Sequence, residues 1–264
     1  HAVRGTVVNW IYYLAPGFTL TLARVTAMVT AMMFLGTTGD SRLPRVVLAF
    51  SLSVMLFLRQ PTVVVVDFGL PELLLLAARE VVLGLLIGFS IQMLFVALRI
   101  AGEILGHEMG FSMSQVIDPT TGASTPVVGR FFETIAYLFM LEVDAHHEAF
   151  RILSELFDRI RVGASWRLEG IVEALWQLAG SMIEAAVLLA APVYACLILL
   201  TIVMVVLARA VPQIHLMEFG YALRILVALV ATWMFFDIAA PHVYRLFASV
   251  FEQTRLMIEA GAAS

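Results

Sequence analysis

The strongest constraint on how this chain can fold is an uncharged stretch of 24 residues, Ala185 to Ala208. About 20 apolar residues in a helix span the hydrocarbon core of a bilayer, and the core of a soluble globular domain usually requires fewer. Arg209 and Pro212 follow almost at once. A charge and a proline at the end of such a helix indicate a packed junction rather than a free end. The chain is therefore expected to fold in lipid or within a large apolar assembly.

The composition supports the same conclusion for the whole chain. Hydrophobic residues make up 61% and charged residues 14%, whereas soluble domains have roughly 45–50% and about 25%. We predict one all-α integral membrane domain covering residues 1–264. The net charge of −4 and the lack of adjacent basic residues argue against a nucleic-acid partner. Cys196 is the single cysteine, which excludes an intrachain disulfide and a zinc framework, and no cofactor is expected.

Apolar stretches and turn signals predict six long helical segments. They cover residues 10–35, 44–58, 71–106, 127–141, 171–208 and 221–251. The most polar part of the chain, residues 142–169, predicts an amphipathic helix followed by a turn. Gly220 is expected to break the chain, Asp237 and Pro241 to interrupt the last helix, and the tail 259–264 to fray.

Residues 106–126 interrupt the helical pattern with three glycines and two prolines. Long loops inside a compact domain are usually functional or disordered, and the apolar residues Met109, Phe111 and Met113 argue against simple disorder. Methionine is flexible and fills irregular gaps. Two interpretations stay open: the three side chains cap the core, or they form a deformable apolar constriction that gates a pore.

The sequence offers no catalytic constellation, so we do not expect an enzyme. Glu103 and His107 have the i,i+4 spacing of two metal ligands, but a third ligand is not evident, and a polar cluster at a helix end is the better interpretation. The segment His146 to Glu148 is interpreted as a solvated helix face. Charges interrupt or border the apolar segments at Arg24, Glu133, Glu184, Arg209, Arg224 and Asp237. Such charges are usually paired or face a pore, so ion pairs between helices or subunits are expected, with a proton or ion relay as the alternative.

Three blocks of residues resemble one known family. The first is Gly102-Glu103, Gly106, Met109-Gly110, Asp118-Pro119 and Pro126; the second is Arg209-Ala210, Pro212-Gln213 and Phe219-Gly220; the third and weakest is Asp144 to His147. Their combination and order resemble the FliR family of flagellar export-gate proteins and its SctT relatives in virulence secretion. The chain departs from the family pattern at Tyr221-Ala222, His215 and Ala145.

The resemblance implies a non-enzymatic subunit of the type III secretion export gate, present as one copy in a helical, ring-like hetero-oligomer with FliP-like and FliQ-like subunits. It implies further partners, namely FlhB-like and FlhA-like export components and unfolded export substrates. The implied location is the bacterial inner (cytoplasmic) membrane, in the flagellar basal body. The loop 106–126 would plug the pore.

Site residues follow from that resemblance. The expected plug or seal residues are Met109, Gly110, Phe111, Met113, Asp118 and Pro119. The expected assembly and packing residues are Gly102, Glu103, Gly106, Arg209, Pro212, Gln213 and Gly220.

A self-contained secondary transporter is the alternative function. Transporters of that kind carry internal repeats with an acid-bearing broken helix in each half. We find no clear internal repeat in the sequence. Behaviour in detergent separates the two hypotheses, because a gate subunit needs its partners for stability, whereas a transporter is stable alone and binds a small solute.

Overall fold

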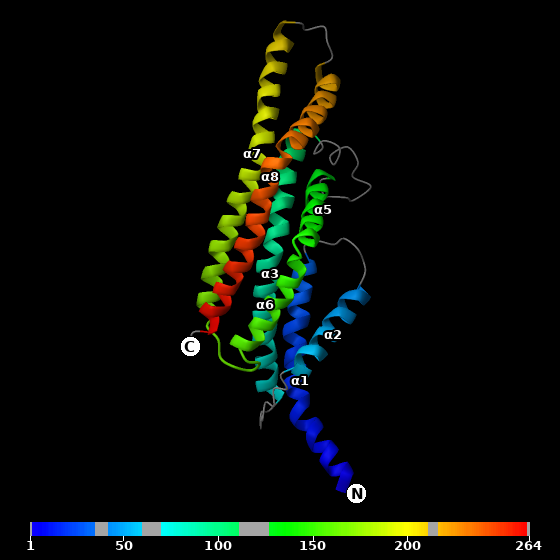
Figure 1. Cartoon of the computed structure of the whole chain (residues 1–264), viewed down its shortest axis with the longest axis vertical. Helices are drawn as coiled ribbons and strands as arrows, with labels where there is room; N and C mark the ends of the chain where they lie inside the picture. The colour runs from blue at the N-terminus through cyan, green and yellow to red at the C-terminus, as the bar shows by residue number, and fades with distance from the viewer. Residues whose placement is uncertain (1, 35–41, 60–69, 111–126, 211–215, 263–264) are drawn as a thin grey trace. The chain divides into compact units, whose positions relative to one another are not determined.

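The regular structure of the chain is α-helical throughout the part that the computed structural model describes, residues 2–34, 42–59, 70–110, 127–210 and 216–262. The helices are α1 (Ala2–Phe34), α2 (Arg42–Arg59), α3 (Leu70–Glu108), α5 (Val127–Glu142), α6 (Ala145–Arg159), α7 (Leu168–Ala210) and α8 (Leu216–Ala262) (Figure 1). The predicted all-α class is confirmed. The predicted polar segment 142–169 contains α6, the end of α5 and the start of α7.

Several predicted helix ends are wrong, and tertiary packing explains them. The loop expected from Gly106 begins later, because α3 stays helical to Glu108. Gly220 lies inside α8, and Pro241 does not end that helix. The tail expected to fray from residue 259 is helical to Ala262. Its neighbours Met257 and Ile258 are buried, and burial of that kind stabilises a helix end that local propensity alone would leave frayed.

Among the residues that the structure describes, three helices are long and apolar enough to cross a membrane. The candidate spans are Pro71–Glu108, Leu168–Ala210 and Gly220–Ala262, by length and composition. They differ in burial, since 67% of the most apolar window of α3 is buried in the chain, against 17% for α7 and 11% for α8. The apolar surfaces of α7 and α8 therefore need cover from outside this chain.

The chain divides into two compact units. Unit 1 comprises His1–Met93, His146–Leu178 and Val250–Ser264, and unit 2 comprises Leu94–Ala145 and Ala179–Ser249. The helices α3, α7 and α8 each contribute a segment to both units.

In unit 1, two glycines let α3 approach α1 closely. A side chain at Gly84 would lie 3.0 Å from Ala27 Cβ, and one at Gly88 would lie 2.8 Å from Ala31 Cβ. The distance at Gly88 is shorter than real Cβ contacts, and the distance at Gly84 is tighter than nine in ten of them. The four-residue spacing of the glycines predicts this small-residue packing, and the structure confirms it.

A fully buried ion pair also links α1 to α3 in unit 1. Arg24 Nε donates to Glu80 Oε2 over 2.5 Å, and both side chains are almost completely inaccessible. Arg24 donates a second bond to the carbonyl of Ile160 over 2.7 Å, and Glu80 accepts the amide of Gly163 over 2.7 Å. Arg24 thus pairs inside the chain rather than with another subunit, and the pair also fixes the end of α6.

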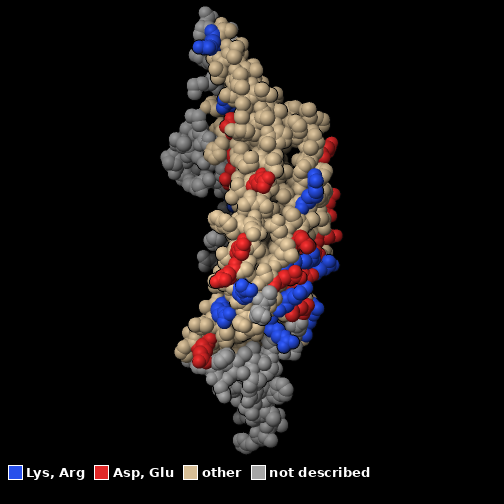
Figure 2. Space-filling view, turned by 90° about the vertical axis from the view of Figure 1, so that its left-hand side faces the viewer, with Lys and Arg blue, Asp and Glu red and all other residues tan. Residues whose placement is uncertain are grey.

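Charged side chains join α6 to the C-terminal part of α8 in unit 1. Arg255 donates to Glu155 over 3.1 Å and also pairs with Glu148, and Arg159 pairs with Glu259 over 3.1 Å. Figure 2 shows acidic and basic side chains close together on part of one face, next to broad areas without charge. Charges of this density indicate a surface in contact with water or a polar partner.

Asp144 makes the turn between α5 and α6 with a left-handed backbone, φ 54°. Its amide donates to the carbonyl of Leu141 over 3.3 Å, which closes the last turn of α5. Non-glycine residues in this conformation are mostly Asn or Asp, and β-branched residues are strongly disfavoured there.

Replacing Asp144 by Val is expected to destabilise the chain by about 1–2 kcal/mol relative to replacing it by Gly, because only Gly adopts this φ without steric cost. Thermal unfolding in detergent measures the difference. Asp144→Asn is the control that keeps the left-handed preference. Equal stability of the Val and Gly variants would contradict the backbone assignment.

Candidate functional site

The candidate site lies in unit 2, where α3 ends. The amide of Met109 donates to Leu105 O over 3.0 Å, and the amide of Gly110 donates to His107 O over 3.1 Å. Gly110 has φ +87°, a left-handed conformation that glycine adopts without cost. A positive-φ glycine directly after the last helical residues is the usual way to stop an α-helix.

The aromatic ring of Tyr221, from α8, lies against the backbone of Gly110. A Cβ atom added at Gly110 would lie 2.5 Å from Tyr221 Cδ1, so no side chain fits there. Arg224, one turn further along α8, reaches the same place, and its Nη1 lies 3.4 Å from the carbonyl oxygen of Glu108. Cations stabilise a helix C-terminus by bonding its free carbonyls and by interacting with the helix dipole. Tyr221 and Arg224 together fix the point where the chain leaves α3.

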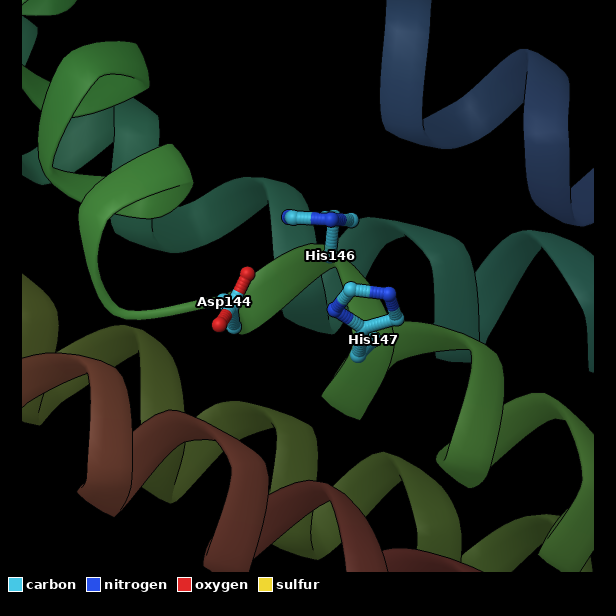
Figure 3. A group of neighbouring side chains, drawn as sticks. All are labelled: Asp144, His146 and His147. Carbon is cyan, nitrogen blue, oxygen red and sulfur yellow. The ribbon is translucent and has the colours of Figure 1, made fainter.

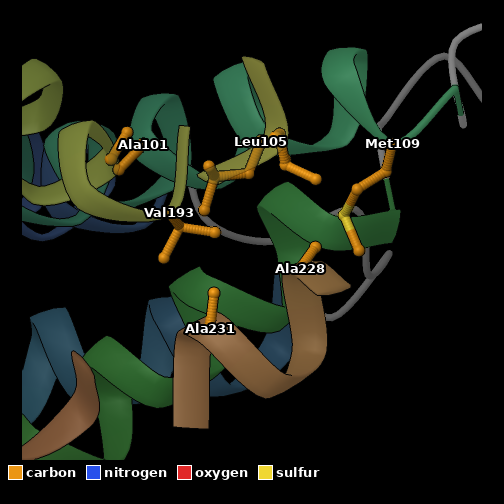
Figure 4. Packing of buried hydrophobic residues seen from close by; sticks show 8 residues of the cluster. Ala101, Leu105, Met109, Val193, Ala228 and Ala231 are labelled. Atoms are coloured by element: carbon orange, nitrogen blue, oxygen red, sulfur yellow. The ribbon is translucent and has the colours of Figure 1, made fainter. Parts of the chain in front are cut away.

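Met109, directly before Gly110, is buried in an apolar cluster formed by α3, α7 and α8. Its neighbours in the cluster include Leu105, Val193 and Ala228, from α3, α7 and α8 (Figure 4). Met109 is 5% exposed. Of the two interpretations of the loop methionines, the geometry of Met109 matches the one in which the side chain caps the core.

The helix α5 packs on the same end of α3 through glycines. A Cβ at Gly102 would lie 2.9 Å from Gly129 Cα, and one at Gly106 would lie 3.3 Å from Val128 Cβ. Glu103 lies on this contact, since a Cβ at Gly129 would lie 2.9 Å from Glu103 Cγ. The packing is seen within the chain, and a role of these residues in assembly with other subunits stays a prediction.

An ion pair reinforces the contact between α3 and α5. Arg99 Nε donates to Glu133 Oε2 over 3.0 Å, and Glu133 is 5% exposed. The charge at Glu133 is therefore paired inside the chain. The sequence analysis singled out Glu133 and did not identify its partner, because Arg99 lies 34 residues away and on a different helix.

A cavity of about 260 Å³ lies between α7 and α8 beside the same junction. Its lining residues are Thr201, Met204, Val205, Ala208, Gly220, Tyr221 and Arg224. Gly220 faces α7, since a Cβ there would lie 3.2 Å from Met204 Cε. Arg209 is exposed at the last turn of α7. The cavity is thus lined in part by Tyr221 and Arg224, the two residues that contact the end of α3.

The remaining predicted site residues lie outside the described residues. They are Phe111, Met113, Asp118, Pro119, Pro212 and Gln213. Tyr221 and Arg224 are the contact residues that the site prediction omitted. A signal was present, because residues three apart on a helix share one face and Tyr221 stands where the sequence departs from the family pattern.

Three possible metal ligands stand together in the turn before α6. One atom from each of Asp144, His146 and His147 lies within 4.8 Å of the others, and Figure 3 shows the three side chains at the helix start. The N-terminus of a helix carries about half a positive charge, which disfavours a cation. Asp144 and His147 are also exposed to solvent. We assign no metal to this turn, and the interpretation of His146 to Glu148 as a solvated helix face stays a prediction.

The chain is similar to proteins that build export systems. The sequence pattern of the family described as "Bacterial export proteins, family 1" matches residues 15–250. The "Flagellar biosynthetic protein FliR" of Bacillus subtilis (strain 168) is 31% identical over 255 residues, which cover 95% of this chain and 97% of the relative.

Two further relatives are more distant. The "Flagellar biosynthetic protein FliR" of Escherichia coli (strain K12) is 27% identical over 176 residues, 67% of each chain. The "Surface presentation of antigens protein SpaR" of Shigella flexneri is 27% identical over 157 residues, which cover 57% of this chain and 58% of the relative.

Proposed function

Because this chain belongs to family 1 of the bacterial export proteins, and is thereby a component of a flagellar or type III export apparatus, we propose that it is the subunit that forms and plugs the protein-conducting pore. The proposed partners are FliP-like and FliQ-like subunits in one hetero-oligomer, FlhB-like and FlhA-like export components, and unfolded substrates. The proposed location is the inner membrane, in the flagellar basal body.

The exposed apolar helices support membership in a larger assembly. At about 1.5 Å per residue, the 43 residues of α7 extend about 64 Å along the helix. The hydrocarbon core of a bilayer is only about 30 Å thick. Exposed apolar side chains nevertheless run along α7 from Leu168 to Leu207. Lipid alone cannot cover this length, so other protein subunits are needed to cover the remainder.

The fixed end of α3 is the observation that best supports the plugging role. A loop that plugs a pore needs an attachment point that does not move, here called the base, and deformable side chains beyond it. Gly110 supplies the base, because Tyr221 packs on its backbone while Arg224 reaches the last carbonyl of α3. Phe111 and Met113 follow directly in the sequence and supply apolar, deformable side chains.

The burial of Met109 separates its role from the roles of Phe111 and Met113. Met109 is held in the cluster with Leu105 and Ala228, and therefore serves the base. We assign the seal itself to Phe111 and Met113. The sequence Asp118-Pro119 favours a turn, which we propose lets the loop reverse its direction.

Replacing Phe111 and Met113 together by Gly is expected to make the resting complex leak ions and small solutes, because the apolar side chains that exclude water are removed. Membrane conductance of cells without export substrate measures the leak. The double variant Phe111→Leu with Met113→Leu is the control, since it keeps apolar volume and should stay sealed. Unchanged conductance of the Gly variant, in complexes formed at normal yield, would refute the seal.

A further inference from the structure

One face of α8 carries an acid among exposed apolar side chains. Asp237 is exposed in unit 2, three and four residues after Met234 and Trp233, which are 66% and 81% exposed. Ile238, the next residue, is 60% exposed. Residues three or four apart are neighbours on a helix surface, so Trp233 and Met234 flank Asp237, and Ile238 lies four residues after Met234. Asp237 is thus surrounded on its own helix by side chains that avoid water.

Pro241 adds a second acceptor at the same place. Pro241 lies inside α8, four residues after Asp237. Proline has no N–H, so the carbonyl of Asp237 lacks the amide donor that an α-helix normally supplies. One turn of α8 therefore offers a carboxylate and a free backbone carbonyl from the same residue.

The nearest donors on α8 are used elsewhere. His242 Nδ1 lies 2.9 Å from the carbonyl oxygen of Ile238, and Arg245 Nε donates to the carbonyl of Pro241 over 3.3 Å. Within the described parts of the chain, no arginine or histidine nitrogen is recorded within ion-pair distance of Asp237. Among the described residues, both acceptors of Asp237 thus have no cationic partner, and we look for one on a neighbouring subunit.

The apolar surroundings of Asp237 indicate which chemical group would bind its carboxylate and carbonyl. A carboxylate facing lipid is costly, and a carboxylate buried against a wholly apolar helix is costly for the same reason. A cation on the covering helix removes the cost, and a guanidinium suits the site best. Its several N–H donors lie in one plane and bind a carboxylate and a neighbouring carbonyl together.

We propose that the face of α8 around Asp237 docks an apolar helix of a neighbouring membrane subunit that carries an arginine or lysine, with the cation bound by the carboxylate and the carbonyl of Asp237. This inference rests on the proposed function, since it supposes a hetero-oligomer in the membrane. The exposed residues Trp233, Met234 and Ile238 form the apolar rim that excludes water from the ion pair.

The test uses the full chain co-expressed with the FliP-like and FliQ-like subunits of its own export system. Asp237→Asn and Asp237→Leu are expected to lower the yield of intact hetero-oligomer about tenfold or more, because each leaves the partner's cation buried without its counter-charge. The amount of chain in the membrane should stay normal, and Asp237→Glu should recover part of the yield. Asp237→Arg combined with an acid at the partner's cation should restore assembly.

A control variant and the behaviour of the wild-type chain distinguish a failure of this inference from a failure of the proposed function. Glu169→Gln, at an exposed acid in the first turn of α7, should leave the yield unchanged. A wild-type yield from Asp237→Leu would overturn the inference and assign this face to lipid, and an equal loss from Glu169→Gln would overturn its specificity. A wild-type chain that forms no hetero-oligomer at all would instead refute the proposed function.

Discussion

Replacing Glu80 by Ala is expected to destabilise the chain by about 3–5 kcal/mol, because Arg24 would remain buried without a counter-charge. Arg24 is 0% exposed and Glu80 is 1% exposed, so water cannot replace the lost partner. The amide of Gly163 would lose its acceptor as well. The midpoint of thermal aggregation of the detergent-solubilised chain, or of its complex, measures the loss.

The double variant Arg24→Met with Glu80→Met is the matched comparison. It removes both charges and keeps apolar volume, and buried ion pairs can often be replaced in this way at small cost. We expect it to be clearly more stable than Glu80→Ala. In the cycle formed with the single variants Arg24→Met and Glu80→Met, we expect a coupling of about 1–3 kcal/mol. Additive losses would contradict the ion pair as described.

Replacing Gly110 by Val is expected to destabilise the end of α3 by about 3 kcal/mol and to abolish or strongly reduce export, since backbone strain and overpacking each cost about 1–3 kcal/mol. Gly110 has φ +87°, and its missing side chain is replaced by the ring of Tyr221. Motility of cells carrying the variant, together with thermal stability of the purified complex, measures both effects.

Gly180→Val is the control for this substitution. It places the same side chain on α7, at a glycine with no atom within 4 Å of the added Cβ. It should cost nothing in stability, because valine has a somewhat higher helix propensity than glycine. The combination Gly110→Ala with Tyr221→Ala relieves the clash but not the strained φ, so it should recover only part of the stability. Full export by Gly110→Val would contradict the anchored base.

Long helices were predictable from the sequence, because apolar stretches of membrane length leave few alternatives. The predicted segment 71–106 and the observed α3 differ by only one or two residues at each end. The break expected at Gly220 and the fraying expected after Glu259 follow from local propensity. In both cases packing against other helices outweighs that propensity, as the contact between Gly220 and Met204 illustrates.

Partners of the intramembrane charges were not predictable. Arg24 and Glu133 stood out in the sequence as costly charges that require pairing. Their partners Glu80 and Arg99 did not, because a buried pair depends on which helices meet, and these pairs join residues 56 and 34 positions apart. Asp237 is the opposite case, since the described chain supplies it with no counter-charge.

The candidate site was predicted in part. The glycines at 102, 106 and 110 were singled out by resemblance. A Cβ at Gly102 or Gly110 would lie closer to its neighbour than real Cβ atoms do, and one at Gly106 would be in tight contact with Val128. The role of Met109 was open between core and constriction, since a methionine suits both and only tertiary structure separates them. Tyr221 and Arg224 were missed as contacts of the loop, because they lie more than 100 residues after Gly110.

The most direct test of the central claim is the mass of the intact particle formed with the partner subunits. The chain is expressed with and without the FliP-like and FliQ-like proteins of its system, and the purified particles are weighed by native mass spectrometry. The account predicts a stable hetero-oligomer that contains one copy of this chain, and an unstable chain when the partners are absent. A stable monomer or homodimer that ignores both partners would contradict the account and favour a self-contained transporter.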